Sequence, residues 1–308
     1  MLLKQAARVL HTTPRFFVAE KGDLAALRKK TGYTIANCKK ALKLHDNDNY
    51  LAEKWLNEQA QSMGWMKATK LEGRSTTQGL VGVLIRGNIG TMVEVNCETD
   101  FVARNEIFKT FVDQASRVCA KYTEMTEFDG DLWKLDFEAD TLKNFKIQDG
   151  RTLGDQLALL IGTVGENAFI KRAICFKTNN ELRLAGYAHP ALPNSTSIVN
   201  TTSFGKYGAI IALRGSIIDD ELQKNLCQHV IGLNPRRIGK VDEDEPVVNK
   251  DDEECLIYQE YLNNADKTVG EVLKENNLTI IDYKRFECGE IKNCSLEEAK
   301  CNHILKMQ

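Results

Sequence analysis

Hydrophobic residues follow two different periods on either side of residue 98. Val93, Val95 and Cys97 alternate with polar residues, which is typical of a half-buried strand. From Asn105, which is suited to be an N-cap, the apolar residues fall on one helical face at positions 107, 108, 111, 112, 115, 118, 119 and 122. Phe101 belongs to neither pattern. It is therefore either a hydrophobic staple against the helix or an exposed anchor for a partner.

A helical period also marks residues 23–61, where we predict three short amphipathic helices. Asp23 can cap the first, Thr34 can cap the second, and Leu51 lies in the third. A unit of about 40 residues with few apolar anchors is only marginally stable alone, so we interpret it as a docking module. Residues 65–78 are polar and basic without a period and are predicted to form a linker.

The predicted core begins at Gly79 with a β-hairpin over residues 79–97. Its glycines do not form a phosphate loop, because no Gly-Lys-Ser/Thr follows and the strand leads to another strand. We therefore expect the chain to hold no nucleotide and no cofactor of its own.

Further along the chain the two periods alternate. We predict helices at 152–161, from Asp219, from Thr268 and from Ser295, and strands at 168–177, 182–188 and 278–288. Val83–Gly87 is weakly repeated in Ile211–Gly215, each a strand leading toward a helix. His229 lies on the helix after Asp219, and we interpret it as structural. These elements indicate an α+β fold.

The composition of the chain argues against several functional classes. The 308 residues are 43% hydrophobic and 27% charged, as in a soluble globular protein of two or three domains. The net charge of −2 argues against broad nucleic-acid binding, and no apolar run approaches the roughly 20 residues that span a bilayer.

Nine cysteines without a C-x-x-C pair indicate a reducing compartment. Cys294, Cys301 and His303 match no common zinc spacing, so no metal is expected. Cys97, Cys119 and His189 are scattered, so we expect no enzyme.

The first 17 residues contain Lys4, Arg8 and Arg15 but no acid, and their apolar residues can share one helical face. This is typical of a mitochondrial targeting peptide, with cleavage after Phe17; a soluble N-terminal segment is the alternative.

Two stretches resemble signatures of the elongation factor Ts family, the nucleotide exchange factors of elongation factor Tu. Every position of Glu94–Arg104 fits the second signature, and Leu27–Gly32 with Cys38–Leu42 resembles the first. The resemblance covers roughly residues 20–290 and extends to the following counterparts: Gly165-Glu166-Asn167, Arg172 and Gly186-Tyr187-Ala188-His189. One region departs from it. Residues 230–267 have room for a helix such as Cys255–Leu262 but not for the long coiled-coil hairpin of bacterial members, which fits the mitochondrial branch.

The resemblance implies a ubiquitin-associated-like helical domain followed by a core of two related α+β subdomains with antiparallel sheets. The predicted division is 1–17 transit peptide, 18–64 helical domain, 65–78 linker, 79–181 and 182–290 core subdomains, and 291–308 C-terminal helix.

The resemblance also implies a function: exchange of GDP for GTP on mitochondrial elongation factor Tu, in the mitochondrial matrix, without nucleic acid or membrane. The residues that match the family's contact positions are Asp100, Phe101, Val102 and Ala103, as a wedge, and His189, as a secondary contact. Asp100 is equally well interpreted as an N-cap. The alternative function is a small adaptor that binds RNA or ubiquitin, suggested by the helical domain and the basic residues Lys67, Lys70 and Arg74.

Overall fold

The computed structural model describes residues 21–31, 33, 35–71, 73–190, 201–215, 219–241 and 243–290. The chain divides into two compact units, residues 1–60 and 61–308. Three predictions lie outside the described residues: the targeting peptide 1–17, the helix from Ser295, and the Cys294, Cys301 and His303 group.

The first unit contains three helices, as predicted. They are α1 (Lys21–Thr31), α2 (Ile35–Leu44) and the first part of α3 (Asn49–Leu71). Leu27, Cys38 and Leu42 are buried at their contacts. Asp48 caps α3 by accepting the backbone N–H groups of Tyr50 and Leu51 at 2.8 and 2.9 Å.

Two predicted boundaries in this region are wrong. α1 begins at Lys21, so Asp23 lies in its first turn and is not its N-cap. α3 continues to Leu71, so the first half of the predicted linker 65–78 is helical. The sequence there, Met-Lys-Ala-Thr-Lys-Leu, contains mostly good helix formers, and this local preference extends the helix beyond the amphipathic stretch.

The second unit is built on two antiparallel sheets. The five-stranded sheet has the order β3-β4-β2-β1-β6, with β1 at Gln78–Arg86, β2 at Ile89–Cys97, β3 at Leu132–Glu138, β4 at Ala168–Thr178 and β6 at Ser203–Gly205. The three-stranded sheet has the order β10-β7-β5, with β5 at Leu182–His189, β7 at Tyr207–Arg214 and β10 at Thr279–Glu287.

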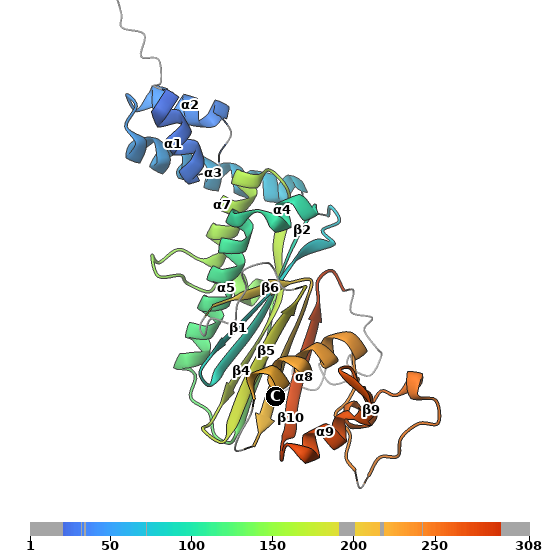
Figure 1. Ribbon diagram of the computed structural model, residues 1–308. Coiled ribbons are helices and arrows are strands. Elements are labelled where there is room, and N and C mark those ends of the chain that lie inside the picture. The colour runs from blue at the N-terminus through green and yellow to red at the C-terminus, as the bar shows by residue number, and fades with distance from the viewer. Residues whose placement is uncertain are drawn as a thin grey trace, which may run out of the picture. The chain divides into compact units, whose positions relative to one another are not determined.

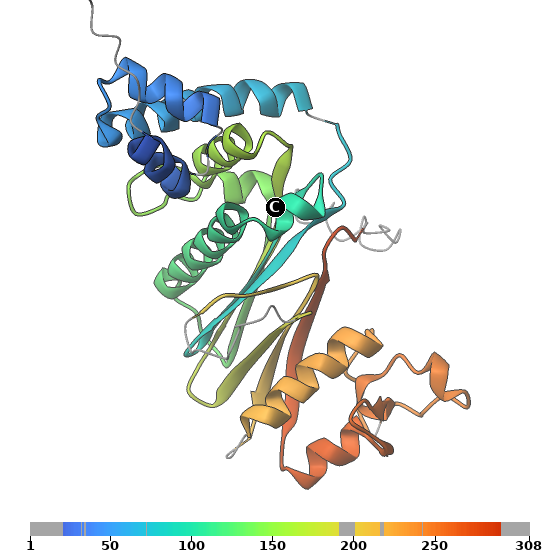
Figure 2. The same cartoon turned by 45° about the horizontal axis from the view of Figure 1, so that its top comes forward.

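Helices cover the outer faces of both sheets. α4 (Asp100–Arg104), α5 (Glu106–Met125), α6 (Ala139–Lys143) and α7 (Leu153–Val164) accompany the first sheet, and α8 (Asp220–Leu233) and α9 (Val269–Glu275) the second. Figures 1 and 2 show the strands between α5 on one side and α8 on the other. The inner faces pack on each other through residues such as Val83, Ile174, Ile210 and Phe286. The layers are therefore helix, sheet, sheet, helix.

The segment between α8 and α9 differs from its prediction. No helix spans Cys255–Leu262; the chain forms short 3₁₀ turns at Lys250–Asp252 and Leu256–Tyr258, then the strands β8 (Glu260–Tyr261) and β9 (Asn264–Thr268). The backbone N–H of Leu256 donates to the carbonyl of Arg237 at 2.9 Å, and that of Ile257 donates to Ile238 at 3.1 Å. These two hydrogen bonds tie the segment to the chain after α8, and the N–H of Tyr258 then donates to the carbonyl of Cys255 at 3.0 Å, which closes a 3₁₀ turn in place of an α-helix.

The core contains a structural repeat. The series β1-β2-α5-α7-β4 recurs as β5-β7-α8-α9-β10, and the strand orders β4-β2-β1 and β10-β7-β5 correspond. The predicted correspondence of Val83–Gly87 with Ile211–Gly215 is wrong, because the first stretch ends β1, an outer strand of its triplet, whereas the second ends β7, a central strand. A clearer trace is Thr152-Leu-Gly-Asp155 and Thr268-Val-Gly-Glu271, both of which form capping boxes.

The two halves of the core are not separated cleanly at residue 181. β6, which lies in the predicted second subdomain 182–290, pairs with β1 of the first through Val81↔Gly205 and Val83↔Ser203. Over the described residues, no helix has the length and apolarity needed to cross a membrane.

Candidate partner-binding site

The short helix α4 stands between the end of β2 and the start of α5. Thr99 is its N-cap, and the hydroxyl oxygen accepts the backbone N–H of Val102 at 3.4 Å. Asn105 then caps α5, as predicted, by accepting the N–H of Ile107 at 2.9 Å. The extra helical turn between strand and helix was not predicted, because five residues are too few to show a period.

Phe101 projects from α4 into solvent. Its side chain is 80% exposed, so it is not a staple against α5. A large aromatic residue that is mostly exposed on an ordered turn is characteristic of an anchor for a partner.

The other predicted wedge residues have different surroundings. Val102 and Ala103 are buried in the core formed by α5, α7 and the first sheet. The prediction that they contact a partner is revised, because their side chains fix α4 to the core. Asp100 is not the N-cap; its carboxylate pairs with Arg104 at 2.9 Å, and both side chains are exposed.

The connection before α4 is fastened to the turn before β4. The Thr99 hydroxyl donates to the Glu166 carboxylate, at 2.9 Å from Oε2 and 3.1 Å from Oε1. In the reverse direction, the Glu98 carboxylate accepts the backbone N–H of Asn167 at 2.8 Å. We call these two contacts the clasp. The clasp brings Glu166 and Asn167 next to the start of α4, although both lie far from Phe101 in sequence.

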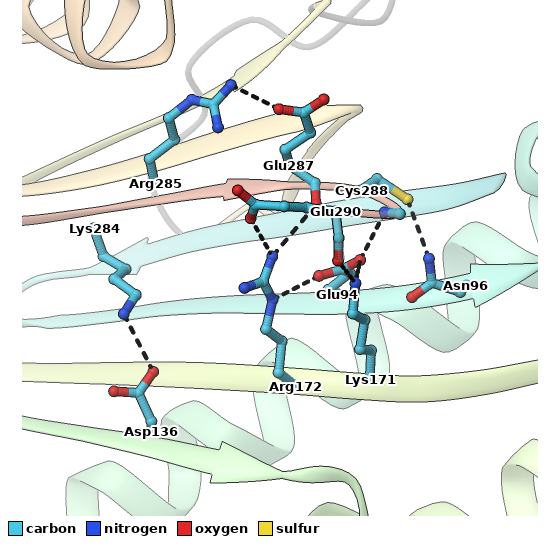
Figure 3. A network of polar contacts seen from close by, with 11 residues as sticks. Glu94, Asn96, Asp136, Lys171, Arg172, Lys284, Arg285, Glu287, Cys288 and Glu290 are labelled. Atoms are coloured by element: carbon cyan, nitrogen blue, oxygen red, sulfur yellow. Dashed lines mark hydrogen bonds and ion pairs between the residues drawn. The ribbon is translucent and has the colours of Figure 1, made fainter. Parts of the chain in front are cut away.

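On β2, four residues before Glu98 of the clasp, Glu94 is the centre of a buried ionic network (Figure 3). Its carboxylate accepts from Arg172 Nε at 2.7 Å, from Lys171 Nζ at 3.1 Å and from the backbone N–H of Gly289 at 2.8 Å. Arg172 also pairs with Glu290 at 3.1 Å. The network joins β2, β4 and the end of β10. The first part of the signature Glu94–Arg104 is therefore structural, and its exposed part begins at Asp100.

The thiols near this network are not nucleophiles. Burial, with smaller contributions from Cys288 and Glu166, raises the pKa of Cys97 to about 12. Burial and the nearby Glu94 carboxylate raise the pKa of Cys288 to about 12 as well. Both thiols are therefore protonated at neutral pH. In the part of the chain that the structure describes, no group of three His, Cys, Asp or Glu residues is arranged to hold a metal ion.

The two singled-out histidines lie in opposite environments. His189 is exposed at the end of β5, and its backbone lies against Gly205, which pairs with Val81 near the start of β1. Because the start of β1 pairs with the end of β2, His189 lies at the same end of the sandwich as α4. His229 is fully buried on α8.

Comparison with known proteins identifies close relatives. Residues 7–66 match the family described as "Elongation factor Ts, mitochondrial, N-terminal", and residues 98–254 match "Elongation factor TS". Mitochondrial elongation factor Ts of Drosophila melanogaster is 59% identical over 307 residues, 96% of each chain. The Aedes aegypti protein of that name is 56% identical over 277 residues, 89% of this chain and 90% of the relative. The Homo sapiens protein of that name is 37% identical over 301 residues, which cover 94% of this chain and 91% of the relative.

Proposed function

Because this chain belongs to the elongation factor Ts family, we propose that it promotes exchange of GDP for GTP on mitochondrial elongation factor Tu in the mitochondrial matrix. The observation that carries this proposal is the exposure of Phe101 on a helical turn whose other side is buried in the core. A hydrophobic side chain held outside its own fold has burial energy available for a partner.

The proposed action requires no covalent chemistry. A GTP-binding protein holds its nucleotide through Mg²⁺ and phosphate-loop contacts, and an exchange factor must favour a form in which some of these are disturbed. Burial of the Phe101 ring in the partner's GTP-binding domain would contribute roughly 1.5–3 kcal/mol toward that form. Coupling is reciprocal, so nucleotide weakens binding of the factor by the same ratio, and the factor only speeds equilibration.

The rest of the site supports Phe101. Val102 and Ala103 hold α4 against the core, so little conformational freedom is lost when the ring is buried. Asp100 presents a carboxylate beside the ring, where it either bonds to the partner or keeps α4 in place through Arg104. His189, exposed at the same end of the sandwich, is a second contact.

The test is release of fluorescent GDP from mitochondrial elongation factor Tu, with and without this protein. Phe101→Ala should slow stimulated release at least tenfold, because the loss of about 1.4 kcal/mol corresponds to one decade in rate. Its thermal stability should remain within about 0.5 kcal/mol of the original, because the ring makes little contact with its own fold.

Met125→Ala is the matched control, since Met125 is 77% exposed at the other end of α5 and should leave release unchanged. Asp100→Ala and Arg104→Ala extend the series. If Asp100 bonds to the partner, only its removal slows release; if it merely pairs with Arg104, the two variants behave alike. Unchanged release with Phe101→Ala would remove the wedge from the proposal.

A further inference from the structure

We propose that Glu166 is a positioning residue for Phe101, acting through the Thr99 hydroxyl at the start of α4. This inference rests on the proposed function, because it explains how the ring is held for its partner. Glu166 lies on the turn between α7 and β4, 65 positions after Phe101, and it is the acceptor for the Thr99 side chain.

The hydrogen-bonding capacity of a hydroxyl group explains the arrangement. Thr99 Oγ1 carries one hydrogen and can accept through its lone pairs. Donation to Glu166 at 2.9 Å directs that hydrogen away from the helix, so a lone pair faces the N–H of Val102. A hydrogen bond to a carboxylate is stronger than one between neutral groups. Glu166 therefore fixes the rotamer of the capping residue, and the cap fixes the direction in which α4 begins.

The second contact of the clasp restrains the same place from the other side. Glu98 precedes Thr99 and accepts the N–H of Asn167, the residue after Glu166. Two neighbouring residues on one connection are thus bonded to two neighbouring residues on the other. Such a pair restrains rotation as well as separation, which a single hydrogen bond does not.

The repeat shows that the fold can close this junction without an acid. Ala168 and Ile280 each lie three residues after a left-handed residue, Gly165 or Asn277, and they pair with Cys97 and Leu213. Glu166 lies two residues before Ala168, as Leu278 lies two residues before Ile280, so these two positions correspond. Thr99 lies two residues after Cys97, as Gly215 lies two residues after Leu213, so these two positions correspond as well.

In the second half of the core, Leu278 packs so closely on Gly215 that a Cβ atom there would collide with it. The equivalent junction is therefore apolar, and the sequence from Gly215 to the end of α8 contains no Phe, Tyr or Trp residue. The polar clasp occurs in the half that carries Phe101, and this coincidence indicates that it serves α4 and not merely the sheet.

GDP release from mitochondrial elongation factor Tu tests the assignment with four variants of the full chain. Glu166→Ala should slow stimulated release about three- to tenfold, because the ring samples unproductive directions. Glu166→Gln should retain most activity, since its amide oxygen still accepts from Thr99. Glu166→Ala should cause no further slowing in the Phe101→Ala background. Glu271→Ala is the matched control, because it removes the acid of a threonine capping box in the second half of the core.

Three results would overturn the assignment: unchanged release with Glu166→Ala, a full additional slowing in the Phe101→Ala background, or a Glu166→Gln variant as slow as Glu166→Ala. Thermal melts separate positioning from unfolding, since Glu166→Ala and Glu271→Ala should lose similar, small stability while only the first slows release. If Phe101→Ala itself has no effect, both the proposed function and this assignment fail. If Phe101→Ala is slow and Glu166→Ala is normal, only this assignment fails.

Discussion

The two halves of the core share a topology but differ where the central strand passes into its helix. In the first half, β2 leads through α4 to α5, and Phe101 is exposed on the way. In the second half, β7 leads to α8 across residues 215–219. Strands and helices recur in both halves, so the repeat supplies the scaffold. The candidate function depends on the segment between the central strand and its helix, which in the first half is α4 with Phe101.

The same comparison distinguishes the centres of the two sheets. Counted from Cys97 and Leu213, the buried Glu94 of β2 corresponds to Ile210 of β7, which is also fully buried. One half stabilises this position with apolar contacts and the other with an ionic network. Burying a charge costs desolvation energy, which only the other charges and hydrogen bonds of the network offset. Removing any one partner therefore leaves a buried charge without full compensation.

The largest effect is therefore expected from Glu94→Gln. It leaves Arg172 buried with one fewer countercharge, and breaking a buried pair costs about 3–5 kcal/mol. Urea unfolding of the purified protein should show this loss in the free energy of unfolding. Asp136→Asn is the control, because its ion pair with Lys284 is half exposed and should be worth less than about 1 kcal/mol. Equal losses for the two variants would show that the burial of Glu94 is energetically unimportant.

The sequence predicted more of the scaffold than of the site. Alternation in Val93–Cys97 and helical spacing from Asn105 were sufficient for β2 and α5, because each element is long enough to show its period. The exposure of Phe101 could not be derived from periodicity, since a staple and an anchor have the same local sequence.

The supporting residues were harder to predict. Glu166 and Thr99 are 67 positions apart, and no local pattern indicates that a turn after one helix meets the cap of another. The burial of Val102 and Ala103 depends on α5 and α7 packing over the same sheet. The capping boxes at Thr152 and Thr268 did carry a signal of the repeat, but only aligned strands make it recognisable.

His229 gives a second, smaller way to test the comparison. Counted from the N-caps Asn105 and Asp219, it corresponds to the buried Ala115 of α5. His229 Nδ1 accepts the N–H of Leu262 at 3.2 Å, so Nε2 carries the proton and donates to Gln259 at 3.0 Å. The histidine thereby ties α8 to the segment before α9. His229→Ala should reduce stability by about 1–3 kcal/mol and leave GDP release unchanged.

The pH dependence of His229 provides the readout. Burial, only partly offset by the hydrogen bond to Gln259, lowers its pKa in the folded protein. The unfolded chain, with a pKa of about 6.5, then takes up the proton first as the pH falls. The contribution is complete above about pH 6.5 and is lost as the pH falls from there toward the lower folded-state pKa. Unfolding free energies at several pH values should show a steeper loss for the original protein than for His229→Ala. Parallel curves would mean that this histidine is accessible to protons in the folded state.

The smallest effect is expected at His189, and it tests whether the second half also contributes to the site. His189 pairs with Tyr207, six positions before Leu213, and Leu84 pairs with Thr91, six positions before Cys97. His189 of β5 therefore corresponds to Leu84 of β1. Leu84 is nevertheless buried, whereas His189 is exposed.

Leu84→Ala should cost about 2–5 kcal/mol of stability, whereas His189→Ala should change it by less than about 0.5 kcal/mol. If His189 is a secondary contact, its removal slows GDP release by a small factor, roughly two- to fivefold, well below the effect of Phe101→Ala. Release rates and thermal melts of both variants make the comparison. A normal release rate for His189→Ala would remove His189 from the proposed partner-binding surface, and the comparison would then show no contribution of this position of the second half to exchange.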